Sequence, residues 1–352
     1  MGLRHLIFAR AGFAAAAAFS AALIASASSA AAQTTIRVAL DGGFTGPSAP
    51  FLIALDRGYY RSEKLDVTIE VATAPPDSVS RVASGAVEFA VADINTVARY
   101  RDQHPAAPIK AVFMVYNKPP YAIIARKSRG ISTPKDLEDK KVGAPTADAA
   151  NAQWPLFAKL NDIDVSKVKI ENVAAAVREP MLAAGQVDAV TGSSLSAYLN
   201  LKERGVPVDD LVIMPMADYG LHLYGDAIIV NTKFASENPE AVKAFLRAYL
   251  KGLKDTIRDP ARAVESVIKR SEGAKKDVEL ERLRMAIRDN IVTEEVRTNG
   301  LGAVDTTRLA NAINQLVLTF SFKKKPEGPD VFDASFLPRA AERRVNGLPR
   351  PG

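Results

Sequence analysis

The sequence predicts an α/β fold with two similar lobes, two crossover strands between them and a helical C-terminal part. The first observation is a pair of similar segments one hundred positions apart, Gly85–Val91 (GAVEFAV) and Gly185–Thr191 (GQVDAVT). Each follows a short helix-like stretch, and Gly can take the left-handed conformation that ends a helix before a buried strand. Two such units favour two lobes whose polar strand ends face one crevice. Because helix–Gly–strand junctions are common, the pair alone leaves coincidence open.

A second pair of similar segments indicates where the chain passes between the lobes. Ala122–Ile124 and Ala227–Ile229 follow the two units at similar distances, and both are apolar and followed by polar residues. Two crossings of this kind form a hinge suited to closing over a ligand. The expected domains are residues 34–125 plus 225–320 for lobe one, 126–224 for lobe two, and 321–352 for a C-terminal tail that wraps the surface or is loose.

The individual elements support an α/β fold. Thr34–Leu40 and Leu65–Val71 have strand patterns, and between them Ala49–Arg57 carries its apolar residues on one side, as a helix does. In Ser132–Leu137 a capping residue precedes Pro at the first helical position, and another helix is expected over Ala149–Leu160. The remaining strands are expected at Ile109–Val115, Tyr121–Ala125, Lys141–Ala144, Val168–Val173, Leu211–Met214 and Ala227–Val230.

The C-terminal third predicts helices only. Asn238-Pro239-Glu240 is a strong helix start, and apolar residues recur at helical spacing as far as Leu253. Further helices are expected after Asp259-Pro260, over Val278–Val292 and over Asp305–Phe320.

The N-terminal segment predicts export. Residues 1–32 combine Arg4 and Arg10, a long Ala-rich apolar run and Ala30–Ala32 at the expected cleavage site, which is typical of a secretory signal peptide. A membrane anchor is the alternative, but no later stretch approaches the roughly 20 apolar residues of a membrane span. The chain has no Cys, which excludes disulfides and anchoring through a lipidated Cys. In a Gram-negative host we expect a periplasmic protein that is not lipid-anchored.

Charge and motifs exclude several classes of function. The formal net charge is +6, of which two charges belong to the predicted signal peptide, and the rest are interspersed, so no nucleic acid partner is expected. The turn Asp41–Gly46 is Gly-rich but lacks both the phosphate-loop ending and the dinucleotide spacing. A loop that approaches a ligand and a plain tight turn are both open for it.

Catalysis and metal binding have little support. After residue 32 the chain contains two His residues, His104 and His222, and neither forms a spacing typical of zinc ligands. No Gly-x-Ser-x-Gly motif occurs. We therefore expect no enzyme activity, no metal and no cofactor.

Aromatic residues at predicted strand ends are candidates for stacking on a planar ligand. Trp154 is the only Trp and falls in the first turns of a helix, where ligands meet helix N-termini, although most single Trp residues serve packing. Phe44, Tyr116 and Tyr224 stand near other predicted strand ends, and His222 lies close to the second crossing.

Several motifs together resemble a known family. They are Ala49–Glu70 (APFLIALDRGYYRSEKLDVTIE), Val82–Ala90 (VASGAVEFA), Ile131–Gly143 (ISTPKDLEDKKVG), Ala183–Val190 (AAGQVDAV) and Asn238–Leu253 (NPEAVKAFLRAYLKGL). Over residues 35–320 the chain resembles the nitrate/sulfonate/taurine and thiamine-pyrimidine solute-binding proteins. The resemblance implies a type II periplasmic binding protein, whose two α/β lobes close on a small solute and deliver it to an ABC permease in the inner membrane. It further implies a sulfonate- or taurine-like solute, or a planar heterocycle or aromatic. A monomer is expected.

The resemblance also implies where the ligand binds. The family's pocket is built from the first strand–helix loop, the turns after the next strands and the corresponding turns of the other lobe. The matching residues here are Phe44, Ser48, Asp77, Ser78, Asp93, Asn95, Thr146, Asp148, Trp154, Gly192, Ser193 and Ser194, to which Tyr116, Tyr224 and His222 are added as candidates. Asp93 and Asp226 favour a zwitterion or an amine-bearing heterocycle over a bare anion.

The chain departs from the pyrimidine-binding members. It opens with Leu40-Asp41-Gly42-Gly43 instead of their Trp/Pro/Asn-containing run, and it lacks the Cys-rich motif of the related eukaryotic pyrimidine synthases. Two alternatives stay open: an enzyme on the same fold that acts on a pyrimidine or aromatic precursor, and a sensory subunit that presents ligand to a membrane receptor.

Overall fold

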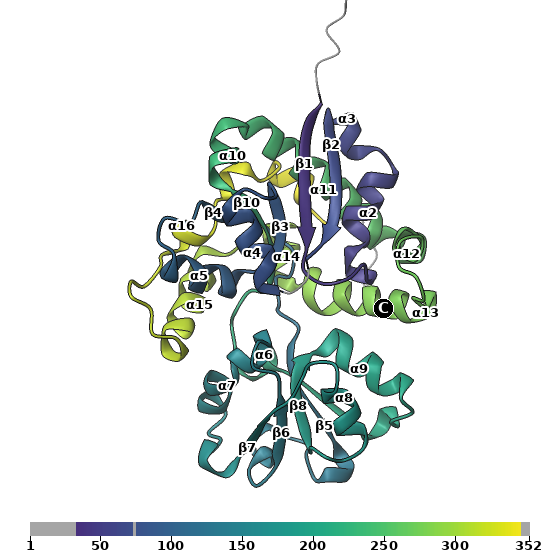
Figure 1. Cartoon of the computed structure of the whole chain (residues 1–352), viewed down its shortest axis with the longest axis vertical. Coiled ribbons are helices and arrows are strands. Elements are labelled where there is room, and N and C mark those ends of the chain that lie inside the picture. Colours follow the sequence, from purple (N-terminus) through teal and green to yellow (C-terminus); the bar gives the residue numbers. More distant parts are fainter. Residues whose placement is uncertain (1–32, 73–74, 346–352) are drawn as a thin grey trace, which may run out of the picture.

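The computed structural model describes residues 33–72 and 75–345 and divides them into two α/β lobes, one above the other in Figure 1. The predicted signal peptide, 1–32, lies outside the described residues. None of the described helices combines the length and apolar character needed to cross a membrane.

Each lobe contains a five-stranded mixed sheet, and the two sheets have the same topology. Lobe one has the order β2-β1-β3-β10-β4, formed by β1 (Thr34–Leu40), β2 (Leu65–Val71), β3 (Phe89–Asp93), β4 (Ile109–Met114) and β10 (Asp226–Asn231). Lobe two has the order β7-β6-β8-β5-β9, formed by β5 (Tyr121–Arg126), β6 (Lys141–Ala144), β7 (Lys169–Asn172), β8 (Ala189–Ser193) and β9 (Leu211–Pro215). In each sheet the fourth strand, β10 or β5, runs antiparallel to its neighbours. The predicted two-lobe α/β fold is confirmed.

The two similar segments form the central strands of the two sheets, β3 and β8. The Gly residues that precede them are left-handed, with φ of 77° at Gly85 and 71° at Gly185. Each strand ends in a polar residue that begins a ten-residue helix, α5 (Ile94–Gln103) after Asp93 and α9 (Ser194–Glu203) after Ser193. The repetition in the sequence is therefore a repetition of structure, with one unit in each lobe.

The first crossing lies earlier than the sequence analysis placed it. β5 pairs with β8 and β9, so Tyr121–Ala125 belongs to lobe two and the chain leaves lobe one over residues 115–120. The return passes over residues 216–225, and β10 then pairs with β3 and β4 in lobe one, as expected. An apolar β-branched run is buried equally well in either sheet, so its composition does not indicate which sheet receives it.

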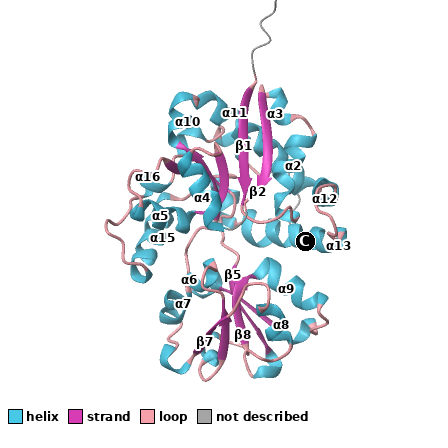
Figure 2. Cartoon of the chain, in the orientation of Figure 1, coloured by secondary structure: helices cyan, strands magenta, loops and turns pink. Residues whose placement is uncertain are grey.

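Helices cover both sheets, as Figure 2 shows. Lobe one has η1 (Gly46–Ser48), α2 (Ala49–Asp56), α3 (Tyr59–Ser62), α4 (Pro75–Ser84) and α5, and lobe two has α6 (Ala149–Ala152), α7 (Trp154–Leu160), α8 (Arg178–Ala183) and α9. After the second crossing come α10 (Thr232–Glu237), α11 (Pro239–Arg258), α12 (Pro260–Ile268), α13 (Lys276–Met285), α14 (Glu294–Asn299), α15 (Thr306–Thr319), α16 (Gly328–Val331) and α17 (Ala340–Arg343).

Some expected helices differ in detail. Ser132–Leu137 contains only a short 3-10 turn (Pro134–Leu137), and the helix expected over 149–160 is interrupted at Gln153. The helix expected over 278–292 changes to a π-helix over Ala286–Ile291. The described part of the tail packs against lobe one, because Asp333 N–H donates to the Ala111 carbonyl and Val345 is buried.

The core of lobe one is held by α11, which lies against α2 with an aromatic cluster beneath it. Phe89 stacks on Phe245 at 4.3 Å between ring centroids, and Phe51 lies 4.3 Å from Tyr249. Gly252 permits the close approach of the two helices, since a Cβ there would stand 2.2 Å from the Pro50 carbonyl oxygen. This contact, more than helix propensity, determines which residue fits at position 252.

We predict that Gly252→Ala destabilises the protein. Helix propensity alone would make Ala more stable than Gly by about 1 kcal/mol, whereas overpacking costs about 1–3 kcal/mol. The free energy of unfolding in urea should fall, while Gly43→Ala, whose Cβ would meet no atom within 4 Å, should leave it nearly unchanged. An increase in stability for Gly252→Ala would show that the helices separate at little cost.

Candidate ligand-binding cleft between the lobes

A cavity of about 610 Å³ lies between the two lobes, at the carboxyl ends of their central strands. Lobe one contributes the end of β1, the loop with η1, the end of β3 and one side of α5. Lobe two contributes residues 146–153 and the turn from β8 into α9, and the first crossing contributes Tyr116. Ligands in open α/β sheets bind at this position because the strand ends and helix N-termini leave polar groups there.

Asp93 organises the lobe-one side of the cavity. Its Oδ1 accepts the Thr96 N–H at 2.7 Å and so caps α5, and its Oδ2 accepts the Tyr121 hydroxyl. Asn95 Nδ2 donates to the Tyr224 carbonyl oxygen at 2.8 Å. Since Tyr121 and Tyr224 border the two crossings, the end of β3 is hydrogen-bonded to both. Burial raises the pKa of Asp93, and its hydrogen bonds oppose that rise.

Two more carboxylates share this wall. Asp226 is the direct partner of Asp93 across the β10–β3 pair, and Asp41 follows β1 beside them. Burial raises the pKa of Asp41 to about 6, with a further contribution from Asp93. Burial, together with the charges of Asp41 and Asp93, raises the pKa of Asp226 well above its ordinary value. The wall is rich in acceptors and favours a ligand that brings positive charge or N–H donors.

The lobe-two side carries an ion-pair cluster of one Arg and two carboxylates. Asp148 caps α6 by accepting the Ala150 N–H at 2.8 Å, and it pairs with Arg178, which also pairs with Glu179 at 2.8 Å. Arg178 and Glu179 are both buried. Because Asp148 is used in these contacts, it positions the wall rather than offering a free charge.

Gln153 is a lobe-two side chain of the cavity lining with an unused acceptor. It lines the cavity and is 2% exposed, and its Oε1 has no hydrogen-bond partner within the described part of the chain. A buried amide oxygen without a partner costs about 1–3 kcal/mol.

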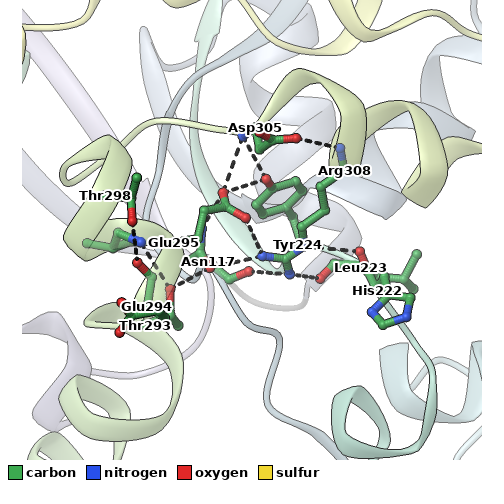
Figure 3. A network of polar contacts seen from close by, with 11 residues as sticks. Asn117, His222, Leu223, Tyr224, Thr293, Glu294, Glu295, Thr298, Asp305 and Arg308 are labelled. Atoms are coloured by element: carbon green, nitrogen blue, oxygen red, sulfur yellow. Dashed lines mark hydrogen bonds and ion pairs between the residues drawn. The ribbon is translucent and has the colours of Figure 1, made fainter.

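The hinge is held on its outer side by a polar network (Figure 3). Arg308 of α15 donates to the Asn117 carbonyl of the first crossing at 2.8 Å and to the Leu223 carbonyl of the second at 2.7 Å. Glu295 of α14 pairs with Arg308 at 2.9 Å and accepts the Tyr224 hydroxyl at 2.6 Å. The C-terminal helices thus connect both passages of the chain to lobe one.

Eight of the fifteen candidate residues line the cavity, namely Ser48, Asp93, Asn95, Tyr116, Thr146, Asp148, Gly192 and Ser193. Trp154 is buried and packs beside Phe157, because its helix turns that side toward the lobe-two core. Tyr224 points into the hinge network, and His222 is exposed next to it. The structure therefore brings the strand-end candidates together and leaves these three outside.

The other candidates outside the lining are Phe44, Ser194, Asp77 and Ser78. Phe44 packs against the lobe-one core, and the Ser194 N–H donates to the Pro120 carbonyl. Asp77 and Ser78 lie in the first half of α4.

Sequence reasoning omitted Asp41, Gln153 and Arg282 from the site, although all three line the cavity. Asp41 directly follows a predicted strand, which could have identified it. Arg282 comes from a helix far along the chain, and nothing local marks it. Among the described residues, no group of His, Asp or Glu side chains is arranged to hold a metal ion.

Comparison with known proteins agrees with this geometry. A family model described as NMT1/THI5 like matches residues 46–263, which is more than half of the chain. The chain belongs to this family. The NMT1/THI5-like relatives include a riboflavin-binding protein of Chloroflexus aurantiacus, 26% identical over 62% of this chain and 61% of that protein. They also include a formylaminopyrimidine-binding protein of Halalkalibacterium halodurans, 26% identical over 69% of this chain and 72% of that protein.

Another relative of this NMT1/THI5-like chain carries an enzyme's name. It is the 4-amino-5-hydroxymethyl-2-methylpyrimidine phosphate synthase of Schizosaccharomyces pombe, 26% identical over 62% of this chain and 64% of the synthase. The chain thus spans less than two thirds of the length of the riboflavin-binding protein and of this synthase.

Solved structures confirm the periplasmic binding protein fold. The aliphatic sulphonate binding protein SsuA from Escherichia coli superimposes with a TM-score of 0.66 over 86% of this chain and 99% of SsuA, at 13% identity. The nitrate-binding protein NrtA from Synechocystis superimposes with a TM-score of 0.62 over 90% of both chains, at 12% identity. At these identities the likeness concerns the fold alone.

We predict that Tyr224→Phe weakens the hinge network and leaves the cleft intact. The variant loses the hydrogen bonds of the hydroxyl with Glu295 and with the Asp305 N–H, so the free energy of unfolding should fall by about 1–3 kcal/mol. Tyr198→Phe, at a partly exposed tyrosine of lobe two, should change it by less than about 0.5 kcal/mol. Equal stability of the two variants would mean that the network contributes nothing.

Proposed function

We propose that this chain is the substrate-binding component of an ABC importer, which captures a small organic solute by closing its two lobes. The observation that carries the proposal is the cavity that both lobes and the first crossing line together. A ligand in this position contacts both walls at once, so it favours the arrangement in which the walls are close. Lobe closure needs a hinge, and a pair of chain segments that connect two lobes is a typical hinge. A periplasmic location, an inner-membrane permease as partner and a monomeric state complete the proposal.

The cleft favours a planar heterocycle that carries an amine or a positive charge. Asp41, Asp93 and Asp226 offer acceptors on one wall, and Gln153 lines the other. Tyr116 lines the cavity beside them and supplies an aromatic surface. A bare sulfonate or nitrate would meet three carboxyl groups on that wall. The named ligands of the riboflavin- and formylaminopyrimidine-binding relatives support a nitrogen heterocycle.

An enzyme on the same fold is the second candidate, because relatives named as pyrimidine phosphate synthases match the chain. The described residues that line the cavity include Ser, Thr and Tyr hydroxyls but no His, Lys or Cys, so no His or Lys base is present in the lining to activate one of these hydroxyls. This composition supports binding over chemistry.

We predict that a nitrogen heterocycle stabilises the protein more than taurine, a zwitterion without a ring, and that simple anions do not stabilise it. Riboflavin, formylaminopyrimidine, taurine, an alkanesulfonate and nitrate would be compared by thermal shift and calorimetry. A ligand at one hundred times its Kd adds about 2.7 kcal/mol to the stability of the folded state, and a micromolar Kd corresponds to about −8 kcal/mol. Tighter binding of taurine or nitrate than of either heterocycle would contradict the ligand class, and turnover of a bound heterocycle would favour the enzyme.

We also predict that a permanently cationic ligand binds more tightly as the pH rises through about 6. Asp41 has a pKa of about 6, so it is protonated below that pH and attracts a cation only above it. The Kd of 1-methylnicotinamide, a planar ring with a fixed charge, should fall between pH 5 and pH 7.5 and then level off. The cavity is also lined by other charged groups, among them Asp93, Asp226, Arg99 and Arg282, which act on the same ligand.

Two variants separate Asp41 from the other groups. Asp41→Asn should weaken binding and remove the rise in affinity near pH 6, whereas Asp209→Asn, at an exposed position of lobe two, should behave as the parent protein. An unchanged pH profile in Asp41→Asn would assign the dependence to another group.

A further inference from the structure

Helix α13 is one of the helices on the lobe-one side that reach lobe two. It follows the segment matched by the family model, which ends at residue 263. In Figure 1 it runs along the lower edge of lobe one, above α9 of lobe two, and the two helices are in contact. Two charged side chains of α13, Glu279 and Arg282, are buried in this position.

Arg282 bridges the lobes by direct hydrogen bonds. Its Nη1 donates to the Leu195 carbonyl oxygen at 3.1 Å and to the Ser196 Oγ at 3.2 Å, both in the first turn of α9. Its Nε and Nη2 donate to Glu279 at 3.2 and 3.3 Å. These contacts use four of the five guanidinium hydrogens, so one Nη2 hydrogen has no partner among the described residues.

Glu279 extends the connection to the lobe-one loop that contains η1 (Gly46–Ser48). Its Oε2 accepts the Gly46 N–H at 2.6 Å, and Gly46 lies between Thr45 and Ser48, which line the cavity. The approach is close, because a Cβ at Gly46 would stand 2.2 Å from the Glu279 carbonyl oxygen. The ion pair therefore links a cavity wall of lobe one to the start of α9 in lobe two.

Exposed ion pairs continue the contact outward. Lys202 of α9 pairs with Glu281 at 2.8 Å, and Glu203 pairs with Lys275, just before α13, at 2.8 Å. Because solvent screens these pairs, each contributes little. The buried hydrogen bonds of Arg282 determine the geometry of the contact, since they hold the guanidinium and its acceptors at the start of α9 in a fixed arrangement.

Arg282 also lines the cavity, and its positive charge is opposite in sign to that of the carboxylates of Asp41, Asp93 and Asp226. Leu195 and Ser196, which it binds, line the cavity as well. When the lobes separate, the bonds to α9 break and Arg282 keeps only Glu279. An acceptor atom of the ligand near the remaining Nη2 hydrogen thus meets a fixed donor only while the lobes are together.

We propose that Arg282 is a positioning and specificity-determining residue, which holds α9 against α13 and selects a ligand with an acceptor on that side. The ligand then carries its donor or positive group toward Asp41, Asp93 and Asp226 and a carbonyl or similar acceptor toward α13. The selection of ligand rests on the proposed solute-binding function, whereas the contact between the lobes does not.

The contact is tested first without ligand. Because the chain contains no Cys, Glu237→Cys in lobe one and Lys159→Cys in lobe two allow one spin label to be attached to each lobe. Arg282→Gln should shift the distances between the labels to longer values. The double variant Glu279→Gln/Arg282→Gln, which leaves no unpaired buried charge, should do the same and keeps the test valid if the single variant folds poorly. Arg284→Gln, at an exposed Arg of the same helix, should match the parent protein.

The ligand arm uses formylaminopyrimidine and riboflavin as probes. For the probe that binds, Arg282→Gln should raise Kd at least tenfold, mostly through faster dissociation, whereas Arg284→Gln and Glu281→Gln should stay within twofold. Unchanged label distances in Arg282→Gln and in the double variant would overturn the proposed contact. Longer distances with an unchanged Kd would overturn the selection of ligand. If neither probe binds the parent protein, the ligand class of the proposed function fails, and the label distances still decide the role of Arg282.

Discussion

The chain passes between its lobes twice, and the need to satisfy polar groups at these two passages constrains the rest of the structure. On the cavity side, the end of β3 holds both passages through Asp93 and Asn95. On the outer side, Arg308 donates to carbonyls of both. Buried backbone groups need partners, so hydrogen bonds join the two passages into one unit from which the two sheets extend.

This arrangement has a consequence for the charge of the cleft. Because β10 returns antiparallel beside β3, it places Asp226 directly opposite Asp93, and the end of β1 adds Asp41. Three carboxylates at one wall oppose ionisation of one another and are eased by a cationic or N–H-rich ligand. The positive charge of Arg282 enters from a helix far along the chain, so the lining of the cavity combines groups of both charges.

Much of the fold and part of the cleft could be predicted from the sequence. The strand ends at Asp93 and Ser193 both line the cavity, as predicted. They could be located from the sequence because a helix that ends in Gly and is followed by an apolar strand is encoded by neighbouring residues. Trp154 and Tyr224 are outside the lining, because a pattern in the chain does not indicate toward which side a helix or crossing turns an aromatic ring. The strand at residues 121–125 was predicted in lobe one and lies in lobe two for a related reason, since both sheets bury an apolar strand equally well.

The sequence by itself determined two α/β units, their left-handed glycines, their helical C-terminal part and the polar turns at their central strands. These features depend on neighbouring residues and on the period of apolar side chains. Only the tertiary structure decided which sheet received each strand and that Gln153, Arg282 and Arg308 act at the cleft or hinge. Their roles depend on packing between segments far apart in the chain, and no short stretch of sequence contains that information.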